Sequence, residues 1–252
     1  MTTIYTDADA DVANLEHETV AVVGYGNQGR SWALNLRDSG AAPMVCVRRD
    51  DTAAQAAADG FETAAIDAAN DASIVCILVP DDIIPSLPVR GRPDGCTIVA
   101  SGYTLAFDRI DVDGDLGMVA PRMLGPEVRR CYEEGVGFIT AVGVHRDLTG
   151  RALPRVLAVA KAIGGLRQGG IELSARQEAV LDLAVEQVLS PALTAVNTTF
   201  VGTMIANDIP LEAIITELVL SGEVERTYRL LREVGYAEQS EFHSPTSQYG
   251  QL

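Results

Sequence analysis

The chain has 252 residues, of which 47% are hydrophobic, so it can form one large domain or two modest ones with a sizeable buried core. Its 35 acidic and 19 basic residues give a formal net charge of -16, which argues against nucleic-acid phosphate or an anionic membrane as the main partner, because both would repel it. Lys161 is the only lysine, which nearly excludes lysine Schiff-base chemistry.

The first two thirds of the chain alternate short apolar runs with helical segments. The runs that predict strands are residues 19–24, 44–47, 73–79, 97–100, 116–120 and 138–144, and the segments that predict helices are residues 30–39 and 52–59. Strands that alternate with helices indicate βαβ units and a parallel sheet covered on both faces. The sequence therefore predicts an α/β fold with a Rossmann-type doubly wound parallel sheet over residues 1–168.

The pattern changes after residue 170, and no strand is expected from Ser174 onward. Residues 174–207 predict one long helix or two nearly continuous ones, and residues 211–234 predict one or two more. A kink is expected at Pro191 and a break at Gly222, and Gly235 is expected to end the last helix. Because long helices of this kind enclose a core poorly on their own, we expect residues 169–252 to form an all-helical C-terminal dimerisation domain.

The start of the chain and its cysteines favour a cytoplasmic protein. No Arg or Lys precedes Arg30, whereas a secretory signal needs a basic start. The four cysteines are Cys46, Cys76, Cys96 and Cys131. They form no CxxC pair, which indicates buried reduced thiols. The charge-free stretch 187–207 contains too many Ser, Thr and Asn residues for a lipid-facing span, so we expect it to be a helix buried against other protein.

A glycine motif lies between the first predicted strand and the first predicted helix. Its residues are Gly24, Tyr25, Gly26, Asn27, Gln28 and Gly29. In a GxGxxG loop the first glycine permits the tight turn, the second lets a pyrophosphate approach the backbone, and the third lets helix and strand pack closely. Because the motif opens the first βαβ unit, as it must, we interpret it as a dinucleotide-binding loop. The alternative is a purely structural glycine turn.

The residues after the second predicted strand are expected to contact the adenosine ribose of the cofactor. A bare Asp or Glu there selects NAD, whereas arginine accommodates a 2′-phosphate. Arg48 and Arg49 come first, which favours NADPH, while Asp50 and Asp51 keep NADH open. The alternative is a solvated loop that touches neither cofactor. The full set expected to bind the cofactor is Gly24, Tyr25, Gly26, Asn27, Gln28, Gly29, Arg48, Arg49, Thr52, Val79, Pro80 and Ser101.

Two carboxylates lie four residues apart on the long helix predicted after residue 174. Asp182 and Glu186 would project from one face of that helix. Carboxylate oxygens on a rigid helix suit Mg²⁺, although two acids at this spacing are also common on solvated helices. Because their neighbours are apolar, these acids need partners. A metal role and a purely structural role therefore both stay open.

Several blocks of the sequence, in the same order, resemble ketol-acid reductoisomerase, the branched-chain amino-acid enzyme. The matching blocks are residues 4–11, 20–29, 33–40, 77–81, 128–135, 162–165 and 182–187, with a looser match over residues 244–250. The resemblance covers most of the chain and is strong to about residue 190. Independent blocks in the right order are far more specific than the glycine motif alone.

The resemblance implies a Rossmann domain followed by a helical domain, with NADPH and two Mg²⁺ as cofactors. In this family one active site migrates an alkyl group in a 2-acetolactate-type substrate and then reduces the resulting ketone. Asp182 and Glu186 match the first pair of the family's metal carboxylates. The family's histidine position holds Ser101 in this chain, and its lysine position holds Arg122.

The family's second pair of metal carboxylates is expected on the helix over residues 213–223. A gapless register places Thr216 and Leu220 there. A shift of one residue places Glu217 and Ser221 there, so neither register restores both acids. Alkyl migration needs Lewis-acid polarisation of a hydroxyl and a carbonyl together, which a pair of metal ions supplies. Because half of the metal ligands are missing, we do not expect two-metal binding or isomerisation. Hydride delivery needs only positioning and one proton donor or anion stabiliser.

We therefore expect an NADPH-dependent oxidoreductase, with NADH as the open alternative, that reduces a small ketone or imine bearing a carboxylate without alkyl migration. The expected catalytic residues are Ser101, Arg122, Asp182 and Glu186, and the expected substrate-side residues are Tyr103, Glu217 and Ser244. Arg122 would hold or polarise the substrate, and Ser101 and Tyr103 would donate hydrogen bonds to it. Asp182 or Glu186 would donate a proton or anchor an amine, since burial raises the pKa of a carboxyl.

Two other functions stay open. One is a minimal Mg²⁺-dependent ketol-acid reductoisomerase, and the other is a non-catalytic NADPH-binding sensor or assembly protein. The expected partners are a small-molecule substrate and a second copy of the chain in a homodimer, with no nucleic acid and no membrane.

Overall fold

The structure, a computed structural model, describes residues 2–241 and 243–249. The chain divides into two compact units, Met1–Leu183 and Ala184–Leu252, which we call unit 1 and unit 2. Unit 1 contains the sheet and unit 2 is helical. The predicted class, an α/β Rossmann-type fold followed by a helical region, is confirmed.

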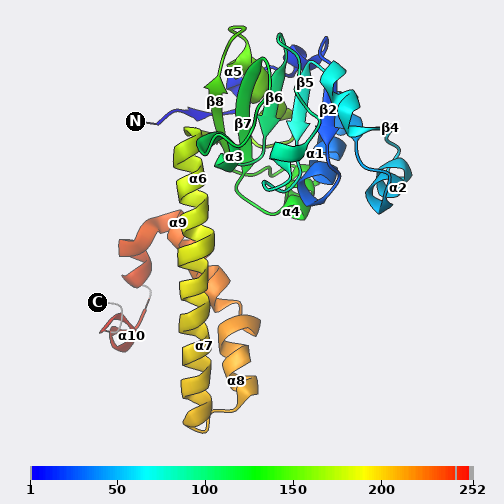
Figure 1. The fold of residues 1–252 in the computed structure, drawn as a ribbon. Coiled ribbons are helices and arrows are strands. Elements are labelled where there is room, and N and C mark those ends of the chain that lie inside the picture. The colour runs from blue at the N-terminus through cyan, green and yellow to red at the C-terminus, as the bar shows by residue number, and fades with distance from the viewer. Residues whose placement is uncertain (1, 242, 250–252) are drawn as a thin grey trace. The chain divides into compact units, whose positions relative to one another are not determined.

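The sheet of unit 1 has the topology of a doubly wound fold at its centre. Its described strands are β1 (Ile4–Tyr5), β2 (Val20–Val23), β3 (Met44–Cys46), β4 (Thr63–Ala64), β5 (Ile74–Ile77), β6 (Cys96–Val99), β7 (Asp115–Pro121), β8 (Thr140–Arg146) and β9 (Gly170–Glu172). They lie in the order β1-β9-β8-β7-β6-β5-β2-β3-β4. The strands from β4 to β7 in this order are all parallel, and the chain order reverses between β2 and β5 (Figure 1). Ligands of open α/β sheets bind outside the carboxyl ends of the strands at such a reversal.

Helical segments connect these strands. Those of unit 1 are η1 (Asp7–Asp9), η2 (Val12–Leu15), α1 (Asn27–Asp38), α2 (Asp51–Ala58), η3 (Ile66–Asp71), η4 (Ile84–Ser86), α3 (Tyr103–Ala106), α4 (Gly125–Glu133), α5 (Ala152–Ala162) and α6 (Ala175–Ala184), the last of which runs into unit 2. The helices predicted over residues 30–39 and 52–59 correspond to α1 and α2. α1 begins at Asn27, three residues earlier than expected, because Gly26 is already its N-cap.

Two strand pairs are antiparallel, so the sheet is mixed and not wholly parallel as expected. β7 pairs antiparallel with β8, and β1 with β9. β8 runs in the opposite direction to β7 because the chain leaves the carboxyl end of β7, forms α4 and re-enters the sheet beside that same end, where Pro121 lies opposite Thr140. The sequence does not predict β1, β4 and β9, since strands of two or three residues are too short to show an alternating pattern.

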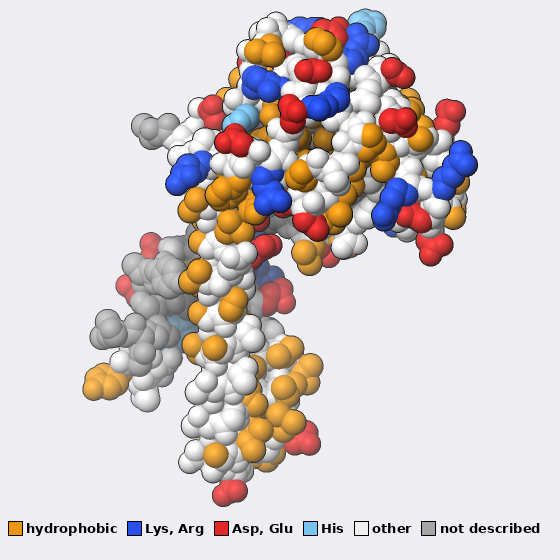
Figure 2. All heavy atoms as spheres, in the orientation of Figure 1, with side chains coloured by type: hydrophobic (Ala, Val, Ile, Leu, Met, Phe, Trp, Pro, Cys, Tyr) orange, Lys and Arg blue, Asp and Glu red, His pale blue; other side chains and the backbone are white. Residues whose placement is uncertain are grey.

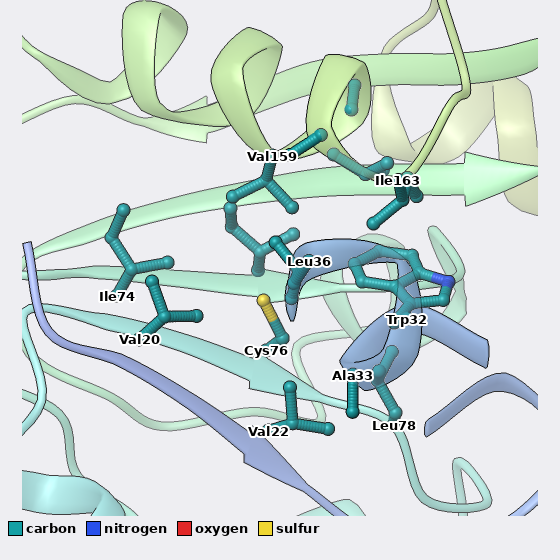
Figure 3. Packing of buried hydrophobic residues seen from close by; sticks show 14 of the residues in the cluster. Val20, Val22, Trp32, Ala33, Leu36, Ile74, Cys76, Leu78, Val159 and Ile163 are labelled. Atoms are coloured by element: carbon teal, nitrogen blue, oxygen red, sulfur yellow. The ribbon is translucent and has the colours of Figure 1, made fainter. Parts of the chain in front are cut away.

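The hydrophobic core lies on both faces of this sheet. α1, α4 and α5 cover one face, and η3, η4, α3 and the start of α6 cover the other. Figure 3 shows the first face, where Trp32 and Leu36 of α1 and Val159 of α5 pack against Val22 of β2 and Cys76 of β5. All five side chains are fully buried. Burial of this apolar surface fixes α1, and with it the loop that precedes α1, on the sheet.

Unit 1 extends past the boundary that the sequence predicts after residue 168. β9 pairs with β8 and β1, so it completes the sheet. Ala175, Glu178 and Ala179 of α6 are buried. The first compact unit therefore ends after Leu183, within α6, and not near the preceding glycine pairs.

Unit 2 consists of helical segments, and its described residues contain no strand. They are the π-helical turn η5 (Val185–Leu189), α7 (Ser190–Ala206), α8 (Leu211–Ile215), the π-helical turn η6 (Thr216–Leu220), α9 (Glu223–Glu241) and α10 (Pro245–Tyr249). η5 precedes Pro191, where a kink is expected. Gly222 (φ 69°) separates η6 from α9, as expected. Gly235 (φ 81°) interrupts α9 but does not end it, because helical residues continue to Glu241.

Unit 2 buries few of its described side chains. Ile214 is its one buried large apolar residue among those described, and no residue of α7 is buried in the isolated chain. Hydrophobic side chains gather over α7 and α8 (Figure 2). By length and composition alone, the continuous helix Ala175–Ala206 could cross a membrane. A single helix of this kind is weak evidence for a membrane span, since core helices of soluble proteins meet the same test.

Candidate functional site

The glycine loop between β2 and α1 has the geometry that a dinucleotide-binding loop requires. Gly24 has φ +94°, and a Cβ there would lie 2.7 Å from the carbonyl oxygen of Leu78. A Cβ on Gly29 would lie 2.2 Å from the carbonyl oxygen of Gly24, so α1 can pack on the loop only with glycine there. A Cβ on Gly26 would meet nothing within 4 Å. Space is therefore left at the N-terminus of α1, where the helix dipole favours an anion.

A cleft lies beside this loop, at the reversal of the strand order. Its volume is about 390 Å³, and its lining comes from the glycine loop, the segment after β5 and the segment after β6. The residues predicted to bind the cofactor that line it are Gly26, Asn27, Gln28, Val79, Pro80 and Ser101. The tertiary structure thus brings together three segments that the sequence analysis named separately.

Two side chains of the glycine loop face protein atoms. Tyr25 is buried, and its hydroxyl donates to Asp59 Oδ2 at 2.9 Å, so burial and this carboxylate raise the pKa of the Tyr25 hydroxyl. The Gln28 amide Nε2 donates to the carbonyl oxygen of Met123 at 3.1 Å, and its Oε1 accepts from Trp32 Nε1 at 3.1 Å. Any contact of Tyr25 with a cofactor is therefore left to its backbone.

A second cleft, of about 400 Å³, lies at the carboxyl end of β3 and is lined in part by Arg48 and Arg49. Both arginines are exposed. Asp50 is the N-cap of α2 and accepts from the backbone N–H of Thr52 at 3.1 Å and from its hydroxyl. These hydrogen bonds hold the pKa of the Asp50 carboxyl below its usual range. The side chain of Thr52 is thus bound to the N-cap residue Asp50, and the two arginines are the cations that line this cleft.

Arg122, which follows β7, contacts two carboxylates of α6. Its Nη1 donates to Glu178 Oε1 at 2.7 Å, and its Nη2 donates to Asp182 Oδ1 at 2.7 Å. The backbone N–H of Gly102 donates to the second oxygen of Glu178 at 2.6 Å. Burial raises the pKa of the Glu178 carboxyl, and the bonds from Gly102 and Arg122 oppose that rise. We call Arg122, Glu178 and Asp182 the arginine–carboxylate cluster.

Sequence reasoning missed Glu178. Its side chain is only 1% exposed, and it connects α6 to the segment that carries Ser101. The available signal was its position four residues before Asp182 on the same helix, the spacing already used for Asp182 and Glu186. A third acid at that spacing could have been noticed, but its partner Arg122 lies 56 residues away in the chain.

The other predicted residues fall into two groups. Ser101 lines the cleft beside the glycine loop, which we call the cofactor-side cleft. Its hydroxyl accepts from the backbone N–H of Tyr103 at 3.1 Å. Tyr103 packs against Phe107 with ring centroids 5.0 Å apart. Ser101, Arg122 and Asp182 thus belong to one region of unit 1. The residues Glu186 (in η5), Glu217 (in η6) and Ser244 (before α10) belong to unit 2, and Gly250 lies outside the described residues.

The donor set in unit 1 does not fit the metal pair that the family resemblance implies. Asp182, the predicted ligand in this unit, already accepts a charge-assisted hydrogen bond from Arg122. Across residues 2–241 and 243–249, no group of three or more His, Cys, Asp or Glu side chains is arranged to hold a metal ion. A guanidinium at a ligand oxygen repels a divalent cation at that position.

The fold and the glycine loop define a dinucleotide-binding α/β protein. Residues 14–169 match the family model for the acetohydroxy acid isomeroreductase NADPH-binding domain. A ketol-acid reductoisomerase (NAD(P)(+)) of Metallosphaera sedula is 41% identical over 74% of this chain and 58% of its own length. A ketol-acid reductoisomerase (NADP(+)) of Sulfurisphaera tokodaii is 34% identical over 99% of this chain and 78% of its own length. The chain belongs to the ketol-acid reductoisomerase family.

A solved structure supports the same assignment. The NADH-preferring ketol-acid reductoisomerase from an uncultured archean superimposes with a TM-score of 0.89 at 31% identity, covering 98% of this chain and 79% of that chain. The predicted cofactor class is confirmed, because the matched domain is the family's NADPH-binding domain. NADH stays open, as the names of these relatives include both nucleotides. The chain spans about three fifths of the length of several curated relatives that it matches.

Gly26→Ala should weaken NADPH binding by at least about tenfold, equivalent to about 1.4 kcal/mol, and leave the fold intact. The added Cβ meets no protein atom within 4 Å, but it fills the space through which a pyrophosphate approaches the backbone. Fluorescence titration with NADPH measures affinity, and urea unfolding measures stability. Gly202→Ala in α7 is the control, since its Cβ also meets nothing within 4 Å. Unchanged NADPH affinity in Gly26→Ala would contradict the assignment.

Proposed function

We propose that the protein is an NADPH-dependent reductase that transfers hydride to a small ketone or imine bearing a carboxylate, without alkyl migration. The observation that carries this proposal is the adjacency of the cofactor-side cleft and the arginine–carboxylate cluster. Ser101 lines the cleft, and the next residue, Gly102, donates its backbone N–H to Glu178 of the cluster. A substrate at the nicotinamide end of the cleft would therefore lie beside polar groups that can orient it.

Hydride transfer to a carbonyl or imine carbon requires positioning and a proton or hydrogen-bond donor for the other atom of the double bond. The bound nicotinamide supplies the hydride. Ser101 and Tyr103 carry the hydroxyls that we assign to donate to the substrate, and Arg122 has further N–H donors for its carboxylate. Asp182 is held by Arg122, so we assign it to positioning that side chain rather than to proton donation. Glu186 stays as a proposed catalytic group from unit 2, and Glu217 and Ser244 stay as proposed substrate-side groups from that unit.

The charges at the site support the proposed absence of alkyl migration. The shift needs a hydroxyl and a carbonyl polarised together by metal ions. In this chain the Asp182 carboxylate is paired with Arg122, and the family's histidine and lysine positions hold Ser101 and Arg122. Neither of the two registers considered for the 213–223 helix supplies a second carboxylate pair. Reduction is the half of the family's reaction that these residues can still support.

A minimal Mg²⁺-dependent ketol-acid reductoisomerase is the second candidate. It is favoured by similarity that extends over nearly the whole chain to proteins named for that activity. The charge pairing at Asp182 argues against it. The two candidates differ in one measurable property, the dependence of acetolactate conversion on Mg²⁺.

We propose a homodimer built through unit 2. The large apolar residues of unit 2 that are exposed in the isolated chain include Leu193, Val196, Phe200, Val219 and Leu220. Obligate interfaces are large and resemble a core cut in half, which such helices would form with a second copy.

The four cysteines are free and buried, which fits the cytoplasm as the proposed location.

The purified protein should oxidise NADPH with small 2-keto acids or cyclic imines, whether or not Mg²⁺ is present, and should form no dihydroxy acid from acetolactates. The reason is that the cofactor loop is intact, while Asp182 is paired with Arg122 and neither register considered supplies the second pair of metal carboxylates. Absorbance of NADPH measures turnover, and mass spectrometry of the products separates reduction from isomerisation. Reactions without substrate are the control. Efficient Mg²⁺-dependent conversion of acetolactate would overturn the proposal in favour of the minimal reductoisomerase.

NADPH should bind at least about tenfold more tightly than NADH, because a charge-assisted hydrogen bond contributes about 1.5–3 kcal/mol before losses. The Arg48→Ala, Arg49→Ala double variant should remove that preference. An Arg229→Ala, Arg232→Ala variant in α9 loses the same charge from unit 2 and should keep the preference. Dissociation constants from fluorescence titration decide the matter. Equal affinity for both nucleotides in the unmodified protein would rule out this role for the two arginines.

Light scattering at micromolar concentration should give about twice the chain mass of 26.7 kDa. Leu220→Glu should shift the protein toward monomer, because it puts a charge on a side chain of unit 2 that is 73% exposed in the isolated chain. Leu148→Glu changes a similarly exposed leucine of unit 1 and is the control. A single 26.7 kDa species in the unmodified protein would refute the dimer.

A further inference from the structure

We infer that unit 1 has a second anion site, formed at the amino ends of its central strands, which takes a small molecule with two or more phosphate or carboxylate groups. The site is a hollow of about 560 Å³ beside η2 and the first turn of α5. Its lining includes His17, Arg92, Arg151 and Arg155. We call it the amino-edge hollow. The inference goes beyond the proposed reaction, because none of these residues belongs to the cofactor-side cleft or to the arginine–carboxylate cluster.

The amino-edge hollow lies at the edge of the sheet opposite the cofactor-side cleft. Thr19 and Ser73, which line it, directly precede β2 and β5, and Asp94 lies in the loop before β6. These three strands are parallel, so their amino ends share one edge. Val79 and Ser101, which line the cofactor-side cleft, follow the carboxyl ends of β5 and β6. A ligand in the amino-edge hollow is therefore separated from the nicotinamide by the length of the strands.

The charge of the lining is opposite in sign to the charge of the protein. Its three arginines outnumber its two acids, Glu18 and Asp94, whereas the whole chain has a formal net charge of -16. The cleft proposed for the 2′-phosphate of the cofactor has a similar excess, with Arg48 and Arg49 against Asp67. The Debye length is about 8 Å at physiological ionic strength, so distant acids are largely screened and the nearby cations decide which ligand enters.

Arg155 gives the amino-edge hollow a buried cation in a fixed position. Its side chain is only 3% exposed. Its Nε donates to Glu18 Oε1 at 2.8 Å, and its Nη1 donates to the carbonyl oxygen of Asp94 at 2.9 Å. Nη1 also lies 3.5 Å from the buried carboxylate of Asp115. Because this side chain is already ordered, a ligand does not have to immobilise it, and that lowers the cost of binding.

Other donors of the lining are unused by the protein. Across the described residues, the side chains of Asn14 and His17 have no hydrogen-bond or ion-pair partner. Arg151, which is 56% exposed, reaches the carbonyl oxygen of Asp94 at 3.5 Å and Glu18 Oε1 at 3.9 Å. Contacts of this length are weak. An oxyanion can therefore accept from all three side chains without breaking a strong hydrogen bond.

The size of the amino-edge hollow favours a ligand larger than a single inorganic anion. Pockets of about 300–1,000 Å³ are typical of sites for small organic molecules. Arg92, which binds Asp94 through Nε and Nη2, adds a further guanidinium to the lining. Phosphate and carboxylate groups both accept the paired N–H donors of a guanidinium. The lining thus selects oxyanion groups, and the two kinds have to be separated by experiment.

The test is the binding of pyrophosphate and of citrate, each measured by isothermal titration calorimetry on the full-length protein in metal-free buffer. NADPH is present in excess, so that the phosphate contacts of the cofactor are filled. At least one of the two anions should bind at one site per chain with a dissociation constant below about 1 mM. Tighter binding of pyrophosphate assigns the site to a phosphate compound, and tighter binding of citrate assigns it to a carboxylate compound.

Arg151→Gln should weaken that binding at least about tenfold, because it removes a charge-assisted hydrogen bond. Arg109→Gln removes the same charge from an exposed position of unit 1 outside the amino-edge hollow and is the control. His17→Ala and Asn14→Ala should each weaken binding about threefold, since uncharged donors contribute less. Circular dichroism checks that each variant is folded. The Arg48→Ala, Arg49→Ala variant should bind the anion as the unmodified protein does, which separates this site from the cofactor cleft.

Two results would overturn the inference. One is a dissociation constant above about 1 mM for both anions in the unmodified protein. The other is equal weakening by Arg151→Gln and Arg109→Gln, which would indicate a general effect of charge and not a site. Because the titrations contain no carbonyl or imine substrate, their outcome is independent of the proposed reductase activity.

Discussion

The buried carboxylate of Glu178 holds together three segments that lie far apart in the sequence. One of its oxygens binds Arg122, after β7, and the other binds the backbone N–H of Gly102, after β6. A buried charge is tolerated only when it is paired and hydrogen-bonded, so the positions of both segments relative to α6 are constrained by this one group. Ser101 and Arg122, the residues proposed to meet the substrate, are both fixed by that constraint.

The cofactor side of the site depends on backbone contacts. Gly29 packs on Gly24 at a distance that no side chain permits. A Cβ on Gly125, at the start of α4, would lie 2.2 Å from the carbonyl oxygen of Asn27, at the start of α1. The carbonyl oxygen of Gly125 also accepts from the Ser31 hydroxyl at 2.7 Å. The loop after β7, which carries Arg122, is therefore packed directly on the helix whose N-terminus is expected to face the pyrophosphate.

These two constraints act on different parts of the family's chemistry. The backbone contacts preserve the dinucleotide cleft, and the match to the NADPH-binding domain agrees with that preservation. The charged side chains beside the cleft are altered, since Ser101 and Arg122 occupy the family's histidine and lysine positions. A cofactor site defined by backbone shape is insensitive to such changes, whereas a metal site depends on the charge of each ligand. The proposal of reduction without the metal-dependent step rests on this difference.

The sequence by itself determined the features that are local in the chain. The glycine loop, the central strands and the helical C-terminal region follow from spacing, β-branched runs and apolar composition, and family resemblance adds the cofactor. Tertiary structure decided what depends on residues distant in sequence. It turned the Tyr25 hydroxyl toward Asp59, made β8 antiparallel to β7, and paired Arg122 with Glu178 across 56 residues. The periodicity of apolar residues predicts which face of a helix or strand is buried. It does not predict which distant group neutralises a buried charge, because the two groups come together only when the elements pack.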